Sequence, residues 1–287
     1  MKPDPDAIGR ALPFETLGWR GLRDERVDEA TLRAAVSAHE GAPGSPPCER
    51  LKDDTRSLVT ACQAADLAVV VKEVRKAGIR RRLADGVRGS AARRGFRAAR
   101  RLIESGIGAA LPLAAVEKRR ARLPTRSLLV SYDLRNDPTA AALLSELAGE
   151  PPSADDRGGD RAEVLRALAE LLASLHRAGA RHGDLRTQHT HCATRPGGGW
   201  TPRLIDLESL SSKRSPCVLR EDARLDDWAQ MNGSIPDAHA SLEERRAAFA
   251  HYARELAFTP RFGAGGDWAF EEMIRRSIAR RHLYQGL

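Results

Sequence analysis

The stretch Arg181-His-Gly-Asp-Leu185 lies between two segments whose patterns indicate secondary structure. In the preceding segment, from Asp160 to Ala178, apolar residues recur at helical spacing, which predicts an amphipathic helix. In the following segment, Arg203-Leu-Ile-Asp-Leu-Glu208, an apolar pair among polar residues predicts a short strand. The sequence therefore predicts two carboxylates, Asp184 in a loop and Asp206 in a strand, that face one cleft across a hairpin.

A second pattern lies upstream, in the β-branched run Leu67-Ala-Val-Val-Val-Lys-Glu-Val74. Its composition predicts a strand, and the run from Ser57 to Thr60 predicts an antiparallel neighbour. Because side chains alternate across a strand, Val70 and Lys72 share one face and Glu73 lies on the other. Lys72 is therefore expected on the inner wall of a small sheet.

The remaining segments predict an α+β fold with strands first and helices later. Strands are expected near residues 14–19 and 127–132, helices over 29–38, 88–105, 137–147, 160–178, 241–256 and 268–281, and an exposed loop over 149–160. Three regions follow: residues 1–50, poorly defined but holding the first elements; residues 51–134, a small sheet ending in a hinge at Tyr132 to Leu134; and residues 135–287, mainly helical.

The chain of 287 residues carries a net charge of +8 and has a pI of about 9.8. This charge favours binding to a polyanion such as nucleic acid, anionic lipid or a phosphorylated glycolipid, but it is equally typical of solvated, arginine-rich helix faces. No apolar stretch is long enough to span a bilayer, and the first residues lack the pattern of a secretory signal. We therefore expect a cytoplasmic protein or one that lies on a membrane surface.

The four cysteines, at positions 48, 62, 192 and 217, are spread along the sequence without a C-x-x-C pair. This spacing predicts neither a disulfide framework nor a thiolate zinc site, and it favours a reducing compartment. A group of other metal-binding residues follows Arg181, namely His182, His189, His191 and Cys192. Its spacing matches no common zinc motif, and a polar loop explains it equally well.

Lys72, Asp184 and Asp206 together carry the groups that phosphoryl transfer requires. That reaction needs a cation on the nucleotide phosphates, a group that accepts the proton of the attacking hydroxyl, and oxygen ligands for magnesium. The three residues occur in the order strand lysine, loop aspartate, strand aspartate. An acid at the end of a buried strand is costly unless it binds something, which favours a metal-binding role for Asp206.

In these motifs the chain resembles the lipopolysaccharide kinase family, the Kdo and heptose kinases that share the protein-kinase fold. The resemblance depends on Val69-Val-Val-Lys72, on His182-Gly-Asp-Leu185 with His189 following, and on Leu204-Ile-Asp-Leu-Glu208. It covers roughly residues 51 to 250, including Asp226-Asp-Trp-Ala-Gln-Met-Asn232. It implies a bilobal, protein-kinase-like fold with a small antiparallel-sheet N-lobe and a mainly helical C-lobe.

The resemblance also implies a reaction and a role for each residue of the site. ATP would be bound with Mg²⁺, and its γ-phosphate would pass to a hydroxyl of a Kdo or heptose residue of the lipopolysaccharide core. Lys72 would hold the phosphates and Asp184 would accept the proton of the sugar hydroxyl. Arg186 would clamp the transferring phosphate. Asp206 and His189 would bind the metal ion.

The adenine ring would lie against Val70, with backbone groups of the hinge residues Tyr132 and Leu134 beside it. The expected partner is the core glycolipid, and the cationic surface would dock it on the cytoplasmic face of the inner membrane. Nucleic acid is not favoured as a partner, because the basic helix between Arg93 and Arg101 carries an apolar stripe that is typical of core packing.

Two residues and one loop depart from the protein-kinase pattern. His189 stands where protein kinases have asparagine. Histidine is common at this position in the heptose-kinase branch, so the departure favours that branch. Gly95 stands where the following helix usually carries a glutamate for the strand lysine, and Asp85 or Glu104 would replace that glutamate only in a shifted register. The loop over residues 51–56 contains no glycine, although a glycine-rich loop is expected to cover the phosphates.

These departures leave two alternatives to a sugar kinase of the lipopolysaccharide core. One is a pseudokinase, a binding or regulatory module that keeps the fold without turnover. The retained Lys72, Asp184 and Asp206 argue against it. The other is a kinase for a different small hydroxylated substrate, such as an aminoglycoside, which a deep acidic pocket would favour.

Overall fold

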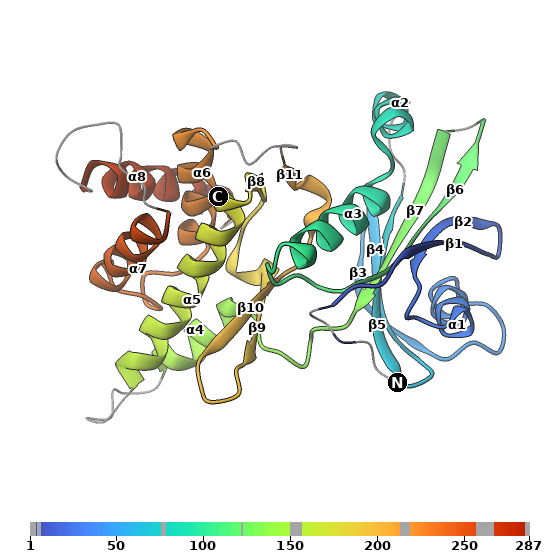
Figure 1. Cartoon of the computed structure of the whole chain (residues 1–287), viewed down its shortest axis with the longest axis horizontal. Helices are drawn as coiled ribbons and strands as arrows, with labels where there is room; N and C mark the ends of the chain where they lie inside the picture. The colour runs from blue at the N-terminus through green and yellow to red at the C-terminus, as the bar shows by residue number, and fades with distance from the viewer. Residues whose placement is uncertain are drawn as a thin grey trace. The chain divides into compact units, whose positions relative to one another are not determined.

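The computed structural model describes residues 4, 7–75, 79–121, 123–149, 157–212, 219–256 and 267–284. The chain divides into two compact units, whose elements are labelled in Figure 1. The first unit consists of Met1–Leu134 and the short segment Asp206–Glu208, and the second consists of Arg135–Ile205 and Ser209–Leu287. A segment that contains a predicted site residue, Asp206, thus belongs with strands that lie far earlier in the sequence.

The first unit is built on one antiparallel sheet of seven strands. In sheet order these are β1 (Ala11–Thr16), β2 (Trp19–Asp24), β6 (Pro112–Arg120), β7 (Leu123–Tyr132), β5 (Leu67–Val74), β4 (Ser57–Ala64) and β3 (Cys48–Asp53). Its helices are α1 (Glu29–His39), α2 (Ile79–Arg88) and α3 (Ala91–Glu104). The predicted mixture of helices and antiparallel strands is confirmed, although the sheet is larger than expected.

The two faces of the sheet differ in character, as β5 shows. Its odd-numbered residues are buried and its even-numbered residues are partly exposed. Helix α1 packs against β4 and β5, and helix α3 packs mainly against β6 and β7. Figure 1 shows these two helices on opposite sides of the sheet. The predicted alternation is therefore confirmed, with Glu73 on the face towards α1 and Lys72 on the other face.

Residues 11–24 form a β-hairpin where the sequence predicted one strand over residues 14–19. That prediction was wrong because the chain turns at Leu17 and Gly18, whose φ angles are 47° and 73°. Two successive residues with positive φ allow the tight turn of a two-residue hairpin. Leucine rarely adopts this conformation, so the apolar pattern looked continuous across the turn.

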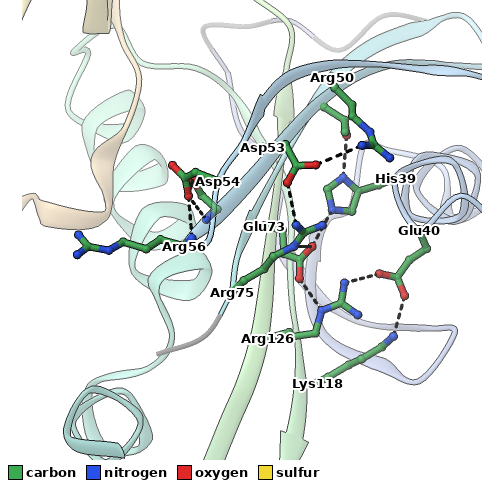
Figure 2. Close-up of polar contacts among 12 residues, drawn as sticks. His39, Glu40, Arg50, Asp53, Asp54, Arg56, Glu73, Arg75, Lys118 and Arg126 are labelled. Atoms are coloured by element: carbon green, nitrogen blue, oxygen red, sulfur yellow. Dashed lines mark hydrogen bonds and ion pairs between the residues drawn. The ribbon is translucent and has the colours of Figure 1, made fainter. Parts of the chain in front are cut away.

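A network of charged side chains occupies the face of the sheet near α1 (Figure 2). Glu73 is fully buried, and its carboxylate lies 3.4 Å from His39, 3.0 Å from Arg75 and 2.5 Å from Arg126. Glu40 binds the other side of Arg126 at 2.7 Å. Burial alone would raise the pKa of Glu73, but the hydrogen bonds from its three partners outweigh burial and hold the pKa below its ordinary value of 4.5.

A disulfide joins Cys48 and Cys62, so the prediction of no disulfide framework was wrong for this pair. The two residues lie opposite each other in the register of β3 and β4. The hairpin thus brings together two cysteines that are separated in the sequence. Cys192 is buried and reduced, and Cys217 lies outside the described residues.

The second unit is mainly helical. Its elements are α4 (Ala140–Gly149), α5 (Arg157–Arg177), β8 (Ala180–Arg181), η1 (Thr187–His189), β9 (Thr190–Thr194), β10 (Trp200–Leu204), β11 (Ser211–Ser212), α6 (Glu221–Gly233), α7 (Leu242–Glu255) and α8 (Asp267–Tyr284). Helix α5 packs against α7, and α6 packs against α8. Strands β9 and β10 form the hairpin that was expected after the loop of Asp184.

Some boundaries in the second unit differ from the predicted ones. Helix α4 begins at Ala140 rather than at residue 137, because the Thr139 side chain accepts a hydrogen bond from the N–H of Ala142 and thereby caps the helix. Helix α5 begins inside the segment predicted to be a loop over residues 149–160. In the described parts of the chain, we find no helix with the length and apolar character that crossing a membrane requires.

Replacing Glu73 with glutamine is expected to lower the free energy of unfolding by about 2 kcal/mol at neutral pH, because Arg75 and Arg126 lose a buried carboxylate. A carboxyl group whose pKa is lowered on folding stabilises the protein above its unfolded pKa, and this stabilisation is lost as the pH falls through the folded pKa. The difference in melting temperature between wild type and Glu73→Gln should therefore shrink as the pH falls below 4.5. Thermal unfolding at several pH values measures it. Glu104→Gln, at the exposed end of α3, should show no such difference, and a pH-independent difference for Glu73→Gln would contradict the prediction.

Reduction of the Cys48–Cys62 disulfide is expected to lower the melting temperature. The bond closes a loop with a sequence separation of 14 residues, and a loop of this size contributes about 3 kcal/mol of stability in the chain-entropy model. The Cys48→Ser variant should melt at the lower temperature without reductant and show no further change with dithiothreitol. A wild-type melting temperature that is the same with and without dithiothreitol would contradict this prediction.

Candidate functional site

Lys72 lies between two carboxylates in the first unit. Its Nζ atom is 2.5 Å from Oδ1 of Asp206 and 2.6 Å from Oε1 of Glu208. Lys72 comes from β5, whereas both acids come from the short segment Asp206–Glu208. The structure thus brings together two predicted site residues, Lys72 and Asp206. It adds a third, Glu208, to which the sequence analysis gave no role.

The backbone turns sharply at Asp206. Strand β10 ends at Leu204, earlier than the strand predicted over residues 203–208. The φ angle of Asp206 is 62°, which is not compatible with an extended strand. Aspartate tolerates this left-handed conformation better than most residues. The chain continues into a short 3-10 turn, Leu207–Ser209. This bend allows both Asp206 and Glu208 to reach Lys72.

One ammonium group therefore meets two carboxylates. Burial lowers the pKa of Lys72, but attraction to Glu208 and Asp206 outweighs burial, so the pKa is raised and the side chain is cationic. Burial raises the pKa of Glu208 to about 7, and a hydrogen bond with Asp206 acts in the same direction. At neutral pH this pKa leaves Glu208 partly protonated, and an additional cation would favour its carboxylate form.

Helix α3 offers Lys72 no carboxylate, as the sequence suggested. Gly95 is buried on this helix. Asp85 on α2 binds Arg94 at 2.6 Å, and Glu104 is exposed at the C-terminal end of α3. Neither acid is a partner of Lys72 in the ion pairs that the structure describes.

The β3–β4 hairpin occupies the place predicted for a phosphate-covering loop without glycine. Residues 51–53, predicted to be loop, belong to β3. The Asp54 carboxylate closes the turn by accepting the backbone N–H groups of Arg56 and Ser57, both at 2.7 Å. These two hydrogen bonds lower the pKa of Asp54 to about 2, and Figure 2 shows Asp54 beside Arg56. Two N–H groups of this turn are therefore already bound to a side chain.

The residues predicted to contact adenine are Val70 on β5, Tyr132 at the end of β7 and Leu134, two residues beyond it. Val70 is partly exposed and pairs with Ser131 across the two strands. The N–H of Tyr132 donates to the carbonyl of Leu111 at 2.9 Å, and Leu134 is buried. The Tyr132 N–H is thus already used within the first unit.

Asp184 lies in a loop of the second unit whose backbone is held by α6. The buried carboxylate of Asp227 accepts the N–H groups of residues 182–183 at 2.9 and 3.2 Å. The side-chain oxygen of Gln230 accepts the N–H of Leu185 at 2.8 Å. These bonds fix the backbone on both sides of Asp184.

Asp227 and Gln230 are site-forming residues that the sequence analysis missed. Burial alone would raise the pKa of Asp227, but hydrogen bonds from His176 and the loop outweigh it and the pKa is lowered, so the group is a carboxylate. The two residues belong to the stretch over residues 226–232 that carried the resemblance. A polar pair three residues apart on the buried face of a helix is the signal that would have revealed them.

The structure brings Asp184, Arg186 and His189 together within the second unit. Arg186 binds the Asp184 carboxylate at 2.7 Å. The Nδ1 atom of His189 lies 2.8 Å from the main-chain oxygen of Asp184. Because this oxygen can only accept, Nδ1 donates to it, which leaves Nε2 as the nitrogen through which His189 could bind a metal.

The structure does not support a zinc cluster in this region. His191 is bonded through Nδ1 to the main-chain oxygen of Asp137 at 2.8 Å. Burial raises the pKa of the Cys192 thiol to about 12, and among the described residues His182, His191 and Cys192 do not belong to a group of side chains placed to hold one metal ion. His182 instead bonds through Nε2 to the main-chain oxygen of Ile205 at 3.1 Å.

Residues 52–249 match the lipopolysaccharide kinase (Kdo/WaaP) family. The chain therefore belongs to this family of kinases, as its motifs suggested. A solved structure described as WaaP in complex with acyl carrier protein is similar to it with a TM-score of 0.61 and 17% sequence identity, over 82% of this chain and 89% of that chain. At this identity the likeness shows a shared fold. No curated protein sequence matches the chain.

Replacing Asp227 with alanine is expected to lower the free energy of unfolding by about 3 kcal/mol, because two loop N–H groups and His176 lose a buried partner. Asp222→Asn, at an exposed position of the same helix, should change it by less than about 1 kcal/mol. Thermal unfolding followed by circular dichroism compares the two variants. Equal destabilisation by both would show that Asp227 does not hold the loop.

Proposed function

We propose that this protein is an ATP-dependent kinase that phosphorylates a hydroxyl of a Kdo or heptose residue of the lipopolysaccharide core. The observation that carries the proposal is the 2.5 Å ion pair between Lys72 and Asp206. A strand lysine and an acid from far along the chain meet there, as phosphoryl transfer requires. Membership of the lipopolysaccharide kinase family supports the same class of reaction.

Lys72 would place its ammonium group on the phosphates of the nucleotide, where positive charge stabilises the charge that develops during transfer. Val70 lies two residues earlier on the same face of β5, so it would contact the adenine ring. Tyr132 and Leu134 would supply backbone groups beside that ring. Since the Tyr132 N–H is already bonded to Leu111, other backbone groups of this segment would have to bind adenine.

Asp184 would accept the proton of the attacking sugar hydroxyl. Its backbone is held through Asp227 and Gln230, which would keep the carboxylate oriented towards the acceptor. Arg186 already binds Asp184 at 2.7 Å. Arg186 would pair with the transferring phosphate and leave Asp184 to the hydroxyl.

Asp206 and His189 would hold magnesium, which would neutralise the charge of the phosphates when bound. The two acids beside Lys72 suit a divalent cation, and His189, whose Nδ1 donates to a main-chain oxygen, would offer Nε2 to it. Imidazole is a softer ligand than the amide oxygen of protein kinases. The N–H of Ile205, which precedes Asp206, donates to the main-chain oxygen of His189 at 2.9 Å.

The lipopolysaccharide core is the proposed partner, because the net charge of +8 favours an anionic glycolipid. We place the reaction on the cytoplasmic side of the inner membrane, with peripheral contact through basic side chains. Disulfides are rare in that compartment, so the Cys48–Cys62 bond is the observation that argues against this location.

A pseudokinase is the second candidate function. It is favoured by the β3–β4 turn, where Asp54 already occupies the N–H groups of Arg56 and Ser57. It is opposed by Lys72 and Asp206, since a binding module does not need an ion pair of catalytic type.

Asp184→Ala is expected to lower the rate of phosphate transfer by about 10²–10⁴-fold, because the proton of the hydroxyl loses its acceptor. Asp206→Ala should abolish transfer by removing the proposed metal ligand. Transfer is measured with γ-labelled ATP, magnesium and deacylated lipopolysaccharide core. Asp222→Asn is the control and should keep full activity.

Each other outcome points to a different assignment. Full activity of Asp184→Ala or Asp206→Ala would refute the catalytic roles. A wild type that binds ATP without turnover on any acceptor would identify the pseudokinase. Turnover on an aminoglycoside but not on the core would identify a kinase for a different class of small hydroxylated substrate.

A further inference from the structure

Lys72 has two carboxylate partners in different surroundings. The Asp206 side chain is 34% exposed and the Glu208 side chain is 13% exposed. Asp206 is also the proposed metal ligand, so its carboxylate would be shared between magnesium and the lysine. Glu208 lies 2.6 Å from Lys72, and the proposed mechanism gives it no role in binding the metal.

Gly95 provides the space that Glu208 occupies. A Cβ atom at position 95 would lie 3.6 Å from Cγ of Glu208 and 3.0 Å from Cδ2 of Leu129. Leu129 is the β7 residue that pairs with Lys72 across the sheet. A longer side chain at position 95 would therefore have to displace Glu208 or Leu129.

Helix α3 also holds the backbone of Glu208. Arg94 donates through Nε to the main-chain oxygen of Glu208 at 3.4 Å. The Arg94 guanidinium is itself fixed by Asp85, at 2.6 Å. Leu207, between the two acids, is buried. The backbone of Glu208 is thus attached to α3, while its side chain passes Gly95 and reaches Lys72.

We propose that Glu208 is the positioning residue of Lys72 and supplies, from the turn after Asp206, the carboxylate that kinases usually place on the helix at position 95. The acid at position 208 then compensates for the missing side chain at Gly95. This inference rests on the proposed function and deepens it, because it assigns a residue that restores the lysine site.

The physical reason for such a residue is the flexibility of lysine. The ammonium group sits on a four-carbon stem with several rotatable bonds. A carboxylate at 2.6 Å holds it in one position before the nucleotide binds, which reduces the entropy lost on binding. A carboxylate on α3 or on the turn would serve equally well, provided that the other position is small or neutral.

The test is a double-mutant cycle in the full-length protein. Glu208→Gln keeps the size of the side chain and removes its charge, and Glu208→Ala also removes its bulk. Both are expected to lower kcat by up to about 100-fold through misplacement of the lysine, and to weaken the binding of magnesium-ATP by about tenfold. Glu104→Gln, which removes an exposed acid of the same unit, is the matched control and should match wild type in both measurements.

Rescue separates positioning from a merely structural role. Gly95→Glu alone should lower activity, because two acidic side chains would compete for the same space and the same lysine. Gly95→Glu combined with Glu208→Ala should recover to within about tenfold of wild type, since the carboxylate returns to the helix. A double variant no better than Glu208→Ala, or a Glu208→Gln variant with wild-type kcat and nucleotide affinity, would overturn the inference. If Glu208→Ala does not fold, as thermal unfolding would show, Glu208→Gln alone, measured by kcat and by nucleotide affinity, decides the question.

Failure of the proposed function would look different. A wild type that transfers no phosphate to the core but binds magnesium-ATP would refute the sugar-kinase assignment, and the same cycle read by nucleotide affinity alone would still decide the role of Glu208. A wild type that binds no nucleotide would overturn both proposals.

Discussion

A partly buried ammonium group requires a nearby negative charge, because an unpaired charge is costly in a protein interior. Lys72 meets this requirement by binding a segment that lies far away in the sequence, Asp206–Glu208. The segment therefore belongs to the first unit, although the residues on both sides of it belong to the second. Two local irregularities accompany this ion cluster, namely the left-handed backbone of Asp206 and the missing side chain of Gly95.

The second unit uses a buried carboxylate for a different purpose. Asp227 accepts backbone N–H groups from the loop of Asp184 and also contacts His176. Burial lowers the pKa of His176, so the ring is neutral and its Nδ1 lies 2.7 Å from the Tyr252 hydroxyl. A chain of hydrogen bonds thus runs from the helical core to the loop. A loop supported in this way presents its side chains on a rigid backbone, which catalysis at an oriented carboxylate requires.

The sequence predicted those features that depend on local pattern or on a motif. The alternation across β5 and the long amphipathic helix α5 follow from residue periodicity, and the family followed from short motifs around Lys72, Asp184 and Asp206. The errors share a different cause. The turn at Leu17 depends on a positive φ angle that leucine rarely adopts, and the bend at Asp206 depends on one that aspartate tolerates but that no local pattern indicates. The role of Glu208 depends on a contact between distant segments, which no spacing in the sequence reveals.

Strand β3 forms one edge of the seven-stranded sheet. Its exposed side chains include Glu49, Arg50, Lys52 and Asp53. Charged edge strands resist pairing with strands of other molecules. The next strand in the sheet, β4, is largely buried and lacks such a row of exposed charged side chains. The Cys48–Cys62 bond fastens this charged edge to β4. The oxidation state of one cysteine pair therefore bears on self-association: without the bond, β3 is freer to detach and expose β4 as an edge on which a second molecule can add a strand.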